Sequence, residues 1–250
     1  MSDIVRFSAR QRVEHLSVML LFTVLAVTGL PQKYFEADLS AAVVHALGGV
    51  AATRLIHRVA GALFSLTLAL HLAVAVRQIS RRELARLAMV PGLQDYRDAV
   101  ATLRWYLGLS REKALFDRYD YRQKFEYWGM LAGSLIMVTT GFALLFPAAA
   151  AGLAPGQLIP AARLAHSQEG LMALLVVIVW HVYNAHLNPD VFPFDWSIFT
   201  GRISRHRMLE EHPLELARIE GRPAPRAQET PMRAAGPQPA QPVEEPPPAA

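Results

Sequence analysis

Apolar residues are concentrated in four blocks that are nearly free of charge. The blocks run from about Leu16 to Pro31, Ile56 to Val76, Tyr127 to Phe146 and Arg163 to Asn188. Long apolar stretches with few charges are typical of helices that cross a lipid bilayer. The first block is short for a membrane span, so we expect the basic turn before it to extend the helix. The pattern therefore predicts an all-α fold, a four-helix transmembrane bundle.

The connections between the blocks differ in charge. The segment from Arg77 to Lys124 carries eleven Lys and Arg residues, whereas the connection after the third block has only Arg163. Arginine-rich loops stay on the cytoplasmic side of a membrane. We therefore expect both termini in the cytoplasm, with the second and fourth spans running in the same direction.

The remaining segments are polar or amphipathic. Two stretches within 77–124, ELARLAMV and YRDAVATLRWYLGL, have helical apolar spacing and are expected on the cytoplasmic membrane surface. After Arg202 the chain is polar and helical in pattern (HRMLEEHPLELARIE), and from Gly221 it is rich in proline and alanine. This predicts a membrane domain over 1–220 and a disordered tail over 221–250. No internal repeat of 20 to 50 residues is evident, only a weak similarity between the second and fourth spans.

The composition narrows the chemistry. The chain contains no cysteine, which excludes cysteine-ligated iron–sulfur clusters, covalent haem attachment and thiol catalysis. The net charge is +4 and the pI about 9.6, but the arginines flank apolar spans as membrane topology requires. Nucleic-acid binding is therefore disfavoured, and membrane lipid is the expected surrounding.

Histidines inside the spans are the strongest chemical signal. At about 100° and 1.5 Å per residue, His57 and His71 share one face of the second span, about 40° and about 21 Å apart. His166 and His181 lie about 60° and about 22 Å apart on the fourth span. Two parallel helices thus present histidines at two matching depths. Paired neutral imidazoles give a six-coordinate haem iron suited to electron transfer.

Neighbouring residues fit this interpretation. Gly61 and Gly170 each follow a histidine by four residues, where a missing side chain lets a porphyrin approach the backbone. Other readings remain. A proton-coupled transporter also uses membrane histidines but usually adds carboxylates in the middle of a span, and a membrane anchor needs no cofactor. A zinc site is disfavoured because His181 and His186 face different sides of their helix.

Several segments resemble the cytochrome b subunits of membrane formate dehydrogenases and nickel–iron hydrogenases, the formate dehydrogenase gamma family. They are RFSARQRVEHLSVMLLFTVLAVTGLP, RLIHRVAG, YDYRQKFEYWGMLAGSLIMVTTG, LAHSQEG and WHVYNAH, within residues 6 to 186. The resemblance implies a bacterial inner-membrane protein with two b-type haems, an electron-transfer subunit of a quinone-linked oxidoreductase complex. It also implies an iron–sulfur or multihaem c-type cytochrome partner at the outer surface. A self-standing cytochrome that uses a small soluble donor is the alternative.

The resemblance also assigns the ligands. It implies that His57 and His166 bind the outer haem, and that His15 and His181 bind the inner one. Periodicity alone pairs His71 with His181, so both pairings stay open. A third haem held by His71 and His186 is a further alternative. Two arginines beside the histidines, Arg58 and Arg163, are candidates for propionate contacts or for snorkelling at the interface.

A quinone site is expected at the start of the third span. The family has a Tyr-Asn segment and a Gln-Lys pair there, near the inner haem, and the matching residues here are Asp120, Arg122, Gln123 and Lys124. Quinone reduction consumes protons, which a carboxylate at the cytoplasmic surface can relay. The alternative is that these charges only anchor the start of a helix at the headgroups.

Overall fold

The computed structural model of this chain describes residues 3–81, 88–153, 156–189 and 191–225. Most of the predicted tail and of the ELARLAMV segment lies outside the described residues.

Four long helices match the four apolar blocks and extend them at their polar ends. Each is long and apolar enough to cross a membrane. They are α1 (Ala9–Lys33), α3 (Val50–Ser80), α5 (Tyr121–Leu145) and α7 (Leu158–Val176), which continues as the π-helix η2 (Val177–Leu187). The predicted all-α transmembrane fold is confirmed.

Polar caps explain why α1 and α5 begin before their apolar blocks. The Ser8 hydroxyl accepts a hydrogen bond from the Gln11 backbone N–H, and the Gln11 side chain bonds back to the backbone of Ser8. Asp120 and Gln123 form the same reciprocal box at the start of α5. Such boxes satisfy backbone donors that a helix start leaves open. Both helices therefore begin one to two turns before the first buried or apolar stretch.

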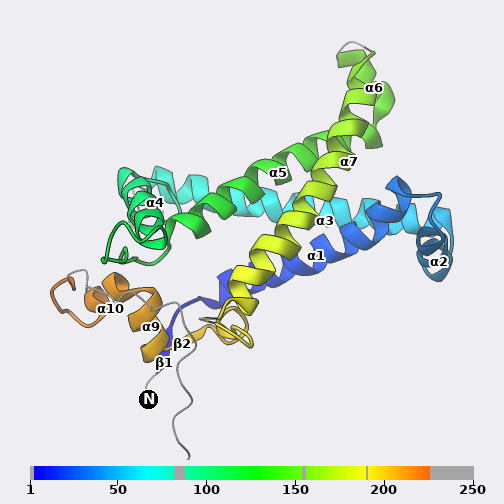
Figure 1. Ribbon diagram of the computed structural model, residues 1–250. Helices are drawn as coiled ribbons and strands as arrows, with labels where there is room; N and C mark the ends of the chain where they lie inside the picture. The colour runs from blue at the N-terminus through cyan, green and yellow to red at the C-terminus, as the bar shows by residue number, and fades with distance from the viewer. Residues whose placement is uncertain (1–2, 82–87, 154–155, 190, 226–250) are drawn as a thin grey trace, which may run out of the picture.

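The four long helices form two antiparallel hairpins, one of α1 and α3 and one of α5 and α7. Contacts run around the bundle from α1 to α3, α5, α7 and back to α1. Short helices close the hairpins, α2 (Asp38–Ala46) in the first and α6 (Pro147–Leu153) in the second. They lie apart at the far ends of the two hairpins (Figure 1). The long helices expose many apolar side chains, as a lipid environment favours.

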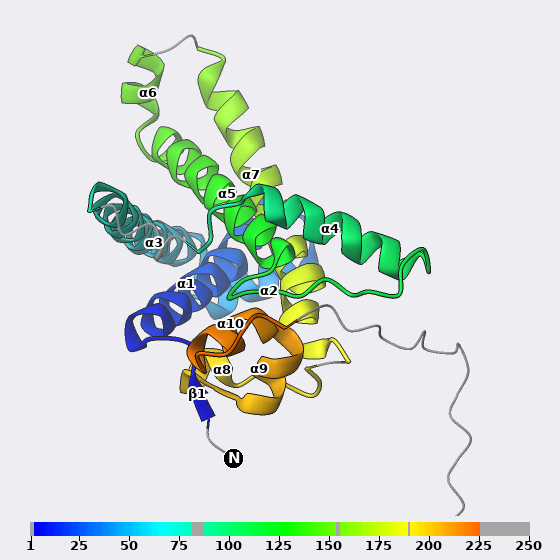
Figure 2. The ribbon, with the colours of Figure 1, turned by 90° about the vertical axis from the view of Figure 1, so that its left-hand side faces the viewer.

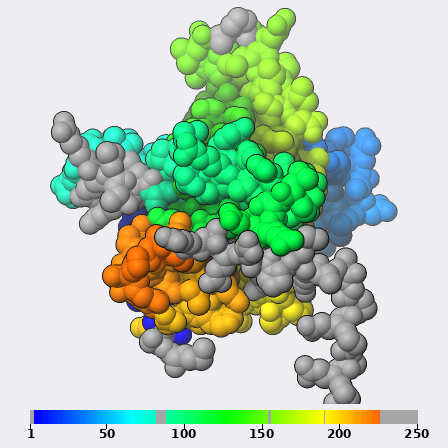
Figure 3. Space-filling view, turned by 60° about the vertical axis from the view of Figure 1, so that its left-hand side comes forward, coloured from blue at the N-terminus to red at the C-terminus, as the bar shows by residue number. Residues whose placement is uncertain are grey.

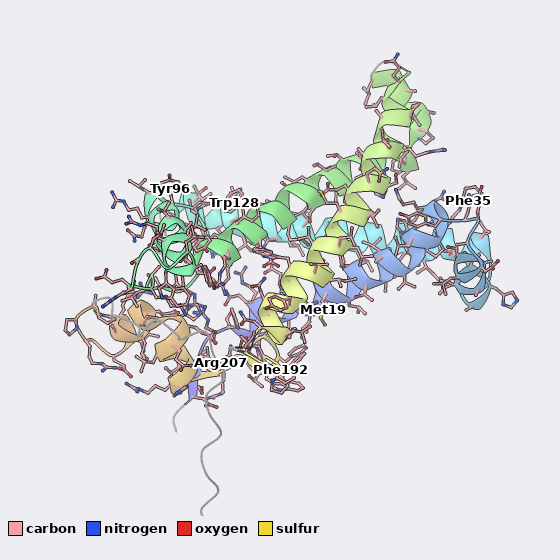
Figure 4. All side chains as sticks on the ribbon, viewed as in Figure 1. Met19, Phe35, Tyr96, Trp128, Phe192 and Arg207 are labelled. Carbon is pink, nitrogen blue, oxygen red and sulfur yellow. The ribbon has the colours of Figure 1, made fainter. Side chains whose placement is uncertain are left out.

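The opposite end of the bundle carries the arginine-rich segment, and we call it the arginine-rich end. The helix α4 (Leu93–Tyr106) lies across this end beside α5 (Figure 2). It includes most of the predicted YRDAVATLRWYLGL helix. Figure 4 places Tyr96 of α4 and Trp128 of α5 on this end and Phe35 at the other.

A small polar cap sits on the arginine-rich end. It contains strand β1 (Asp3–Val5), helix α8 (Ser197–Thr200), strand β2 (Arg202–Ser204), and helices α9 (Arg205–Glu211) and α10 (Pro213–Ile219). The two strands pair antiparallel, and Ile203, Met208 and Leu216 form a buried core. Figure 3 shows the cap in orange and gold against the green segment that precedes and begins α5. The helical pattern after Arg202 is thus confirmed, while the three-residue strands carry no periodic signal.

Candidate functional site

One pair of histidines lies in the half of the bundle that adjoins α2 and α6. The ring centres of His57 on α3 and His166 on α7 are 6.3 Å apart. Each ring has a threonine on its Nδ1 atom: Thr28 lies 2.8 Å from His57, and Thr140 lies 3.0 Å from His166. The two histidines therefore come from different hairpins, and each is oriented from within its own hairpin.

The threonines also select the tautomer of these histidines. The Thr28 hydroxyl donates to the Val24 carbonyl at 2.7 Å, and the Thr140 hydroxyl donates to the Ile136 carbonyl at 2.6 Å. A hydroxyl has only one proton to donate. The threonine oxygen must therefore accept the hydrogen bond from the histidine Nδ1–H. Nε2 of each ring then keeps a free lone pair, which a metal-binding imidazole requires.

A glycine follows each threonine and makes room for the histidine ring. A Cβ atom added at Gly29 would lie 3.1 Å from Cε1 of His57, and one added at Gly141 would lie 3.3 Å from Cε1 of His166. Both distances are shorter than an ordinary van der Waals contact. Each Thr-Gly pair thus bonds the Nδ1 atom of an imidazole through the threonine and leaves room for the adjoining ring edge at the glycine.

A second pair lies closer to the arginine-rich end. The ring centres of His15 on α1 and His181 on η2 are 6.0 Å apart. The Nδ1 atom of His181 pairs with the Glu126 carboxylate, which leaves Nε2 of that ring free. The Nδ1 atom of His15 is buried and finds no hydrogen-bond partner among the described residues.

Both pairs have the spacing that a shared metal would need. A metal–imidazole bond is about 2 Å long and the nitrogen lies about 1 Å from the ring centre, so two trans imidazoles place their ring centres about 6 Å apart. Within the described part of the chain, no three His, Cys, Asp or Glu side chains gather as a bare metal ion would require. The pairs therefore fit a metal that brings its equatorial ligands with it, as haem iron does.

The π-helix explains how His181 reaches this position. His57 and His71 are fourteen residues apart, whereas His166 and His181 are fifteen apart. A π-helical turn takes up about one more residue than an α-helical turn. The extra residue between His166 and His181 is absorbed in η2, which begins at Val177. His181 therefore occupies the depth and side that His71 occupies on α3.

The two hairpins form an internal repeat with a period far longer than 20 to 50 residues. The helix α5 repeats α1 at an offset of 112 residues, which aligns both capping boxes and both Thr-Gly pairs. The repeated residues are Arg10, Gln11, Glu14, Thr28 and Gly29 in α1, and Arg122, Gln123, Glu126, Thr140 and Gly141 in α5. On α3 and α7, His57 and Gly61 correspond to His166 and Gly170. The weak similarity between the second and fourth spans is part of this longer repeat.

The polar cap joins the two repeats symmetrically. Arg6 and Arg118, which are also 112 residues apart, each pair with a different oxygen of the Glu215 carboxylate. Each arginine also donates to the backbone carbonyl of the other. Such a reciprocal pair of hydrogen bonds is expected between two halves related by an approximate twofold axis. Glu215, which is only 3% exposed, therefore holds the starts of the two hairpins together.

The repeat clarifies the position of His71. Its Nδ1 atom pairs with Glu14 and its Nε2 atom lies 2.7 Å from the Tyr127 hydroxyl. By the repeat, Glu14 corresponds to Glu126, and Tyr127 corresponds to His15. The structure thus brings His15, not His71, to His181, and gives His71 a tyrosine where His181 has a histidine.

The residues of the predicted quinone site take part in helix-end contacts. Asp120 caps α5, and the Arg122 guanidinium donates to its carboxylate at 2.7 Å and 3.0 Å. Gln123 completes the capping box. Lys124 forms a 2.8 Å ion pair with Asp95 of α4. The four residues lie together at the arginine-rich end, as predicted, and the quinone role stays a prediction.

The remaining predicted site residues do not take part in the two histidine pairs. The glycines on α3 and α7 face the preceding helix, since a Cβ at Gly61 would lie 3.9 Å from Leu25 and one at Gly170 3.4 Å from Met137. Arg58 and Arg163 are exposed. His186 stacks on Phe194 with ring centres 4.0 Å apart, so the structure does not pair it with His71.

The polar partners of the histidines were not predicted. They are Thr28, Thr140, Glu14, Glu126 and Tyr127. Their signal in the sequence is the recurrence of Glu and Thr-Gly fourteen residues apart on both hairpins. That signal becomes visible only when α1 is aligned with α5.

Four membrane-spanning helices with paired, inward-facing imidazoles define the class of integral membrane b-type cytochromes. The prokaryotic cytochrome b561 family matches residues 6–191, and the chain belongs to this family. The family binds b-type haem and transfers electrons in the bacterial membrane. A comparison with curated proteins finds no match to the chain.

Proposed function

We propose that this cytochrome holds two b-type haems and passes electrons between a redox partner at the outer surface and the quinone pool. The observation that carries the proposal is the pair of imidazole–imidazole separations, 6.3 Å and 6.0 Å, at two depths of one bundle. Two separate ligand pairs allow charge to cross the membrane in two steps. The two-haem proposal rests on the family match and on the geometry of the two imidazole pairs together.

The chain supplies the ligands and their orientation. His57 and His166 would hold one haem, and His15 and His181 would hold the other. Bound haem supplies reversible one-electron redox chemistry at each pair. The threonine and carboxylate partners fix the ring tautomers, and the apolar helices keep water away from the pairs.

The charge pattern supports an orientation. We infer that the arginine-rich end, with both termini and the polar cap, faces the cytoplasm, because positively charged segments stay inside. The opposite end, with α2 and α6, then faces an iron–sulfur or multihaem c-type cytochrome subunit. Quinone binds at the arginine-rich end near Asp120, Arg122, Gln123 and Lys124. There it takes up two electrons and two protons when it is reduced to quinol, and releases them when quinol is oxidised.

The test is a reduced-minus-oxidised spectrum of the purified protein with haem counted per chain. We expect about two b-type haems, one of them lost in His57→Ala and one in His15→Ala. His71→Ala is the matched control on the same face of α3 and keeps both. Loss of a haem in His71→Ala, with both haems retained in His15→Ala, would mean that His71 and not His15 binds the inner haem. A third haem would revive the His71 and His186 alternative, and a wild-type protein without haem would leave a non-redox anchor.

A further inference from the structure

The inner half of the bundle contains two corresponding sites, of which only one has two histidines. His15 and His181 form one site between α1 and η2, and Tyr127 and His71 form the other between α5 and α3. The Tyr127 and His71 ring centres are 5.8 Å apart. The internal repeat relates the two sites residue by residue. The second site therefore has the framework of the first with one imidazole replaced by a phenol.

The phenol changes what the second site can bind. Nε2 of His71 is already engaged by the Tyr127 hydroxyl at 2.7 Å, so it presents no free lone pair to an iron. The Glu14 carboxylate accepts from the Nδ1–H of His71, which makes Nε2 the acceptor and the tyrosine O–H the donor. The tyrosine oxygen keeps lone pairs that can accept a further hydrogen bond. A ligand with a hydroxyl donor suits this position.

The surroundings point to a ligand that comes from the lipid. The side chains of His71 and Glu14 are 30% and 24% exposed on helices whose outer faces are otherwise apolar. A partly exposed carboxylate–imidazole pair within membrane-spanning helices is costly and usually functional. Trp128, next to Tyr127, is exposed on the same helix and lies toward α4 in Figure 4. An aromatic ring of a lipid-soluble carrier can therefore approach from the side.

The second site also lies beside the inner histidine pair. Glu14 directly precedes His15 on α1, and Tyr127 directly follows Glu126, the partner of His181, on α5. On both α1 and α5, a residue of the second site is therefore next in sequence to a residue of the inner pair or its carboxylate partner. Tyr127 also lies one turn deeper than Lys124, so the site continues inward from the capped start of α5.

We propose that Tyr127 and His71 form the quinol headgroup site, in which a quinol hydroxyl donates a hydrogen bond to the Tyr127 oxygen. The proposal rests on the proposed function, because it assumes that quinone is the carrier. It moves the headgroup contact from the helix-end residues Asp120 and Lys124 to the deeper pair. The Asp120 carboxylate is already bonded by Arg122 and Gln123, and Lys124 is already paired with Asp95. Glu14 acts as a positioning residue that orients His71.

The experiment measures binding of a hydroxyquinoline N-oxide, a quinol analogue with a hydroxyl donor, to the full-length protein in lipid nanodiscs. Fluorescence quenching gives the dissociation constant without requiring turnover. We expect Tyr127→Phe to weaken binding about three- to tenfold, the effect of one lost hydrogen bond. The matched control is Tyr106→Phe, an exposed tyrosine on α4, and it should stay within twofold of the wild type. Haem per chain is measured in both of these variants and should not change.

A gain-of-ligand variant tests the same site independently. Tyr127 corresponds to His15 in the repeat, so Tyr127→His gives the second site two histidines like the first. We expect the haem count to rise from two to three and the analogue to be excluded. Unchanged affinity in both Tyr127→Phe and Tyr127→His would overturn the proposal.

Two outcomes separate this inference from the proposed function. If Asp120→Asn or Lys124→Ala weakens binding while Tyr127→Phe does not, quinone chemistry stands and the headgroup site lies at the start of α5. If the haem-loaded wild type does not bind the analogue, the quinone role itself is wrong and the headgroup site falls with it.

Discussion

The two hairpins of this cytochrome share one layout and differ at a single decisive residue. Both carry a glutamate and a Thr-Gly pair on the first helix and two histidines on the second. The residue after the glutamate is His15 in the first hairpin and Tyr127 in the second. One hairpin therefore completes an inner histidine pair and the other does not. A duplicated framework can thus hold a redox site on one side and a different site on the other.

The two histidine pairs also differ in their electrostatic setting. The pair of His57 and His166 is flanked by neutral threonines, whereas His181 pairs with a carboxylate. A negative charge beside an axial ligand stabilises the more positive ferric state. The inner haem should therefore have the lower reduction potential of the two.

The largest effect is expected where the Thr-Gly pair is disturbed in one hairpin. Gly29→Val places its Cβ 3.1 Å from Cε1 of His57, so the ring must leave its position. We expect the loss of the outer haem, from about two haems per chain to about one, measured by a haem assay. Gly129→Val is the matched control, since an added Cβ there meets nothing within 4 Å. Two retained haems in Gly29→Val would show that the ring has room.

The next effect concerns the polar cap that joins the hairpins. His212 is 4% exposed, bonds the Asp117 carbonyl, and lies beside Arg6, Glu211 and Glu215. Burial, followed by the Arg6 charge, lowers its pKa from 6.5 to about 4. The folded cap thus holds neutral histidine, and the opened cap binds a proton below about pH 6.5.

The stability that depends on neutral His212 is therefore fully present above about pH 6.5 and is lost as the pH falls toward about 4. The free energy of opening should drop by about 2 kcal/mol between pH 7 and pH 5, measured by hydrogen exchange of residues 202–219. His212→Gln should flatten this dependence. The control His206→Gln, on an exposed side chain, should keep it. A pH-independent wild type would contradict the assignment.

The smallest effect tests the electrostatic difference between the pairs. Glu126→Gln removes the carboxylate beside His181 and should raise the inner haem potential by on the order of 50–100 mV, measured by redox titration. Its counterpart Glu14→Gln faces His71 and should shift either haem by less than half as much. Equal shifts in the two variants would mean that the two hairpins are not distinguished by these carboxylates.

The sequence was sufficient for the four spans because a lipid solvent demands long, uncharged stretches. The apolar pattern did not predict where the helices begin, because the capping residues Ser8 and Asp120 start α1 and α5 ahead of the apolar stretches. Periodicity found His57 and His166 because both lie on periodic, membrane-buried faces. It failed for His15, which lies on a different helix, near its start, and has no periodic partner. The pairing therefore needed the family resemblance.

The polar partners were out of reach for a different reason. Thr28, Glu14 and Tyr127 gain meaning only from contacts between helices 29 to 57 residues apart in sequence. The repeat that would have revealed them has a period of 112 residues, because each unit is a whole membrane hairpin with its connections. The extra residue absorbed in η2 further obscures the correspondence of His71 with His181.

The central claim is that two pairs of imidazoles each hold one haem. Electron paramagnetic resonance of the oxidised wild-type protein, with haem counted per chain, tests it most directly. The account predicts two low-spin ferric signals of the bis-imidazole type and about two haems per chain. A high-spin signal, a signal of histidine–tyrosine ligation, or a single haem would contradict it.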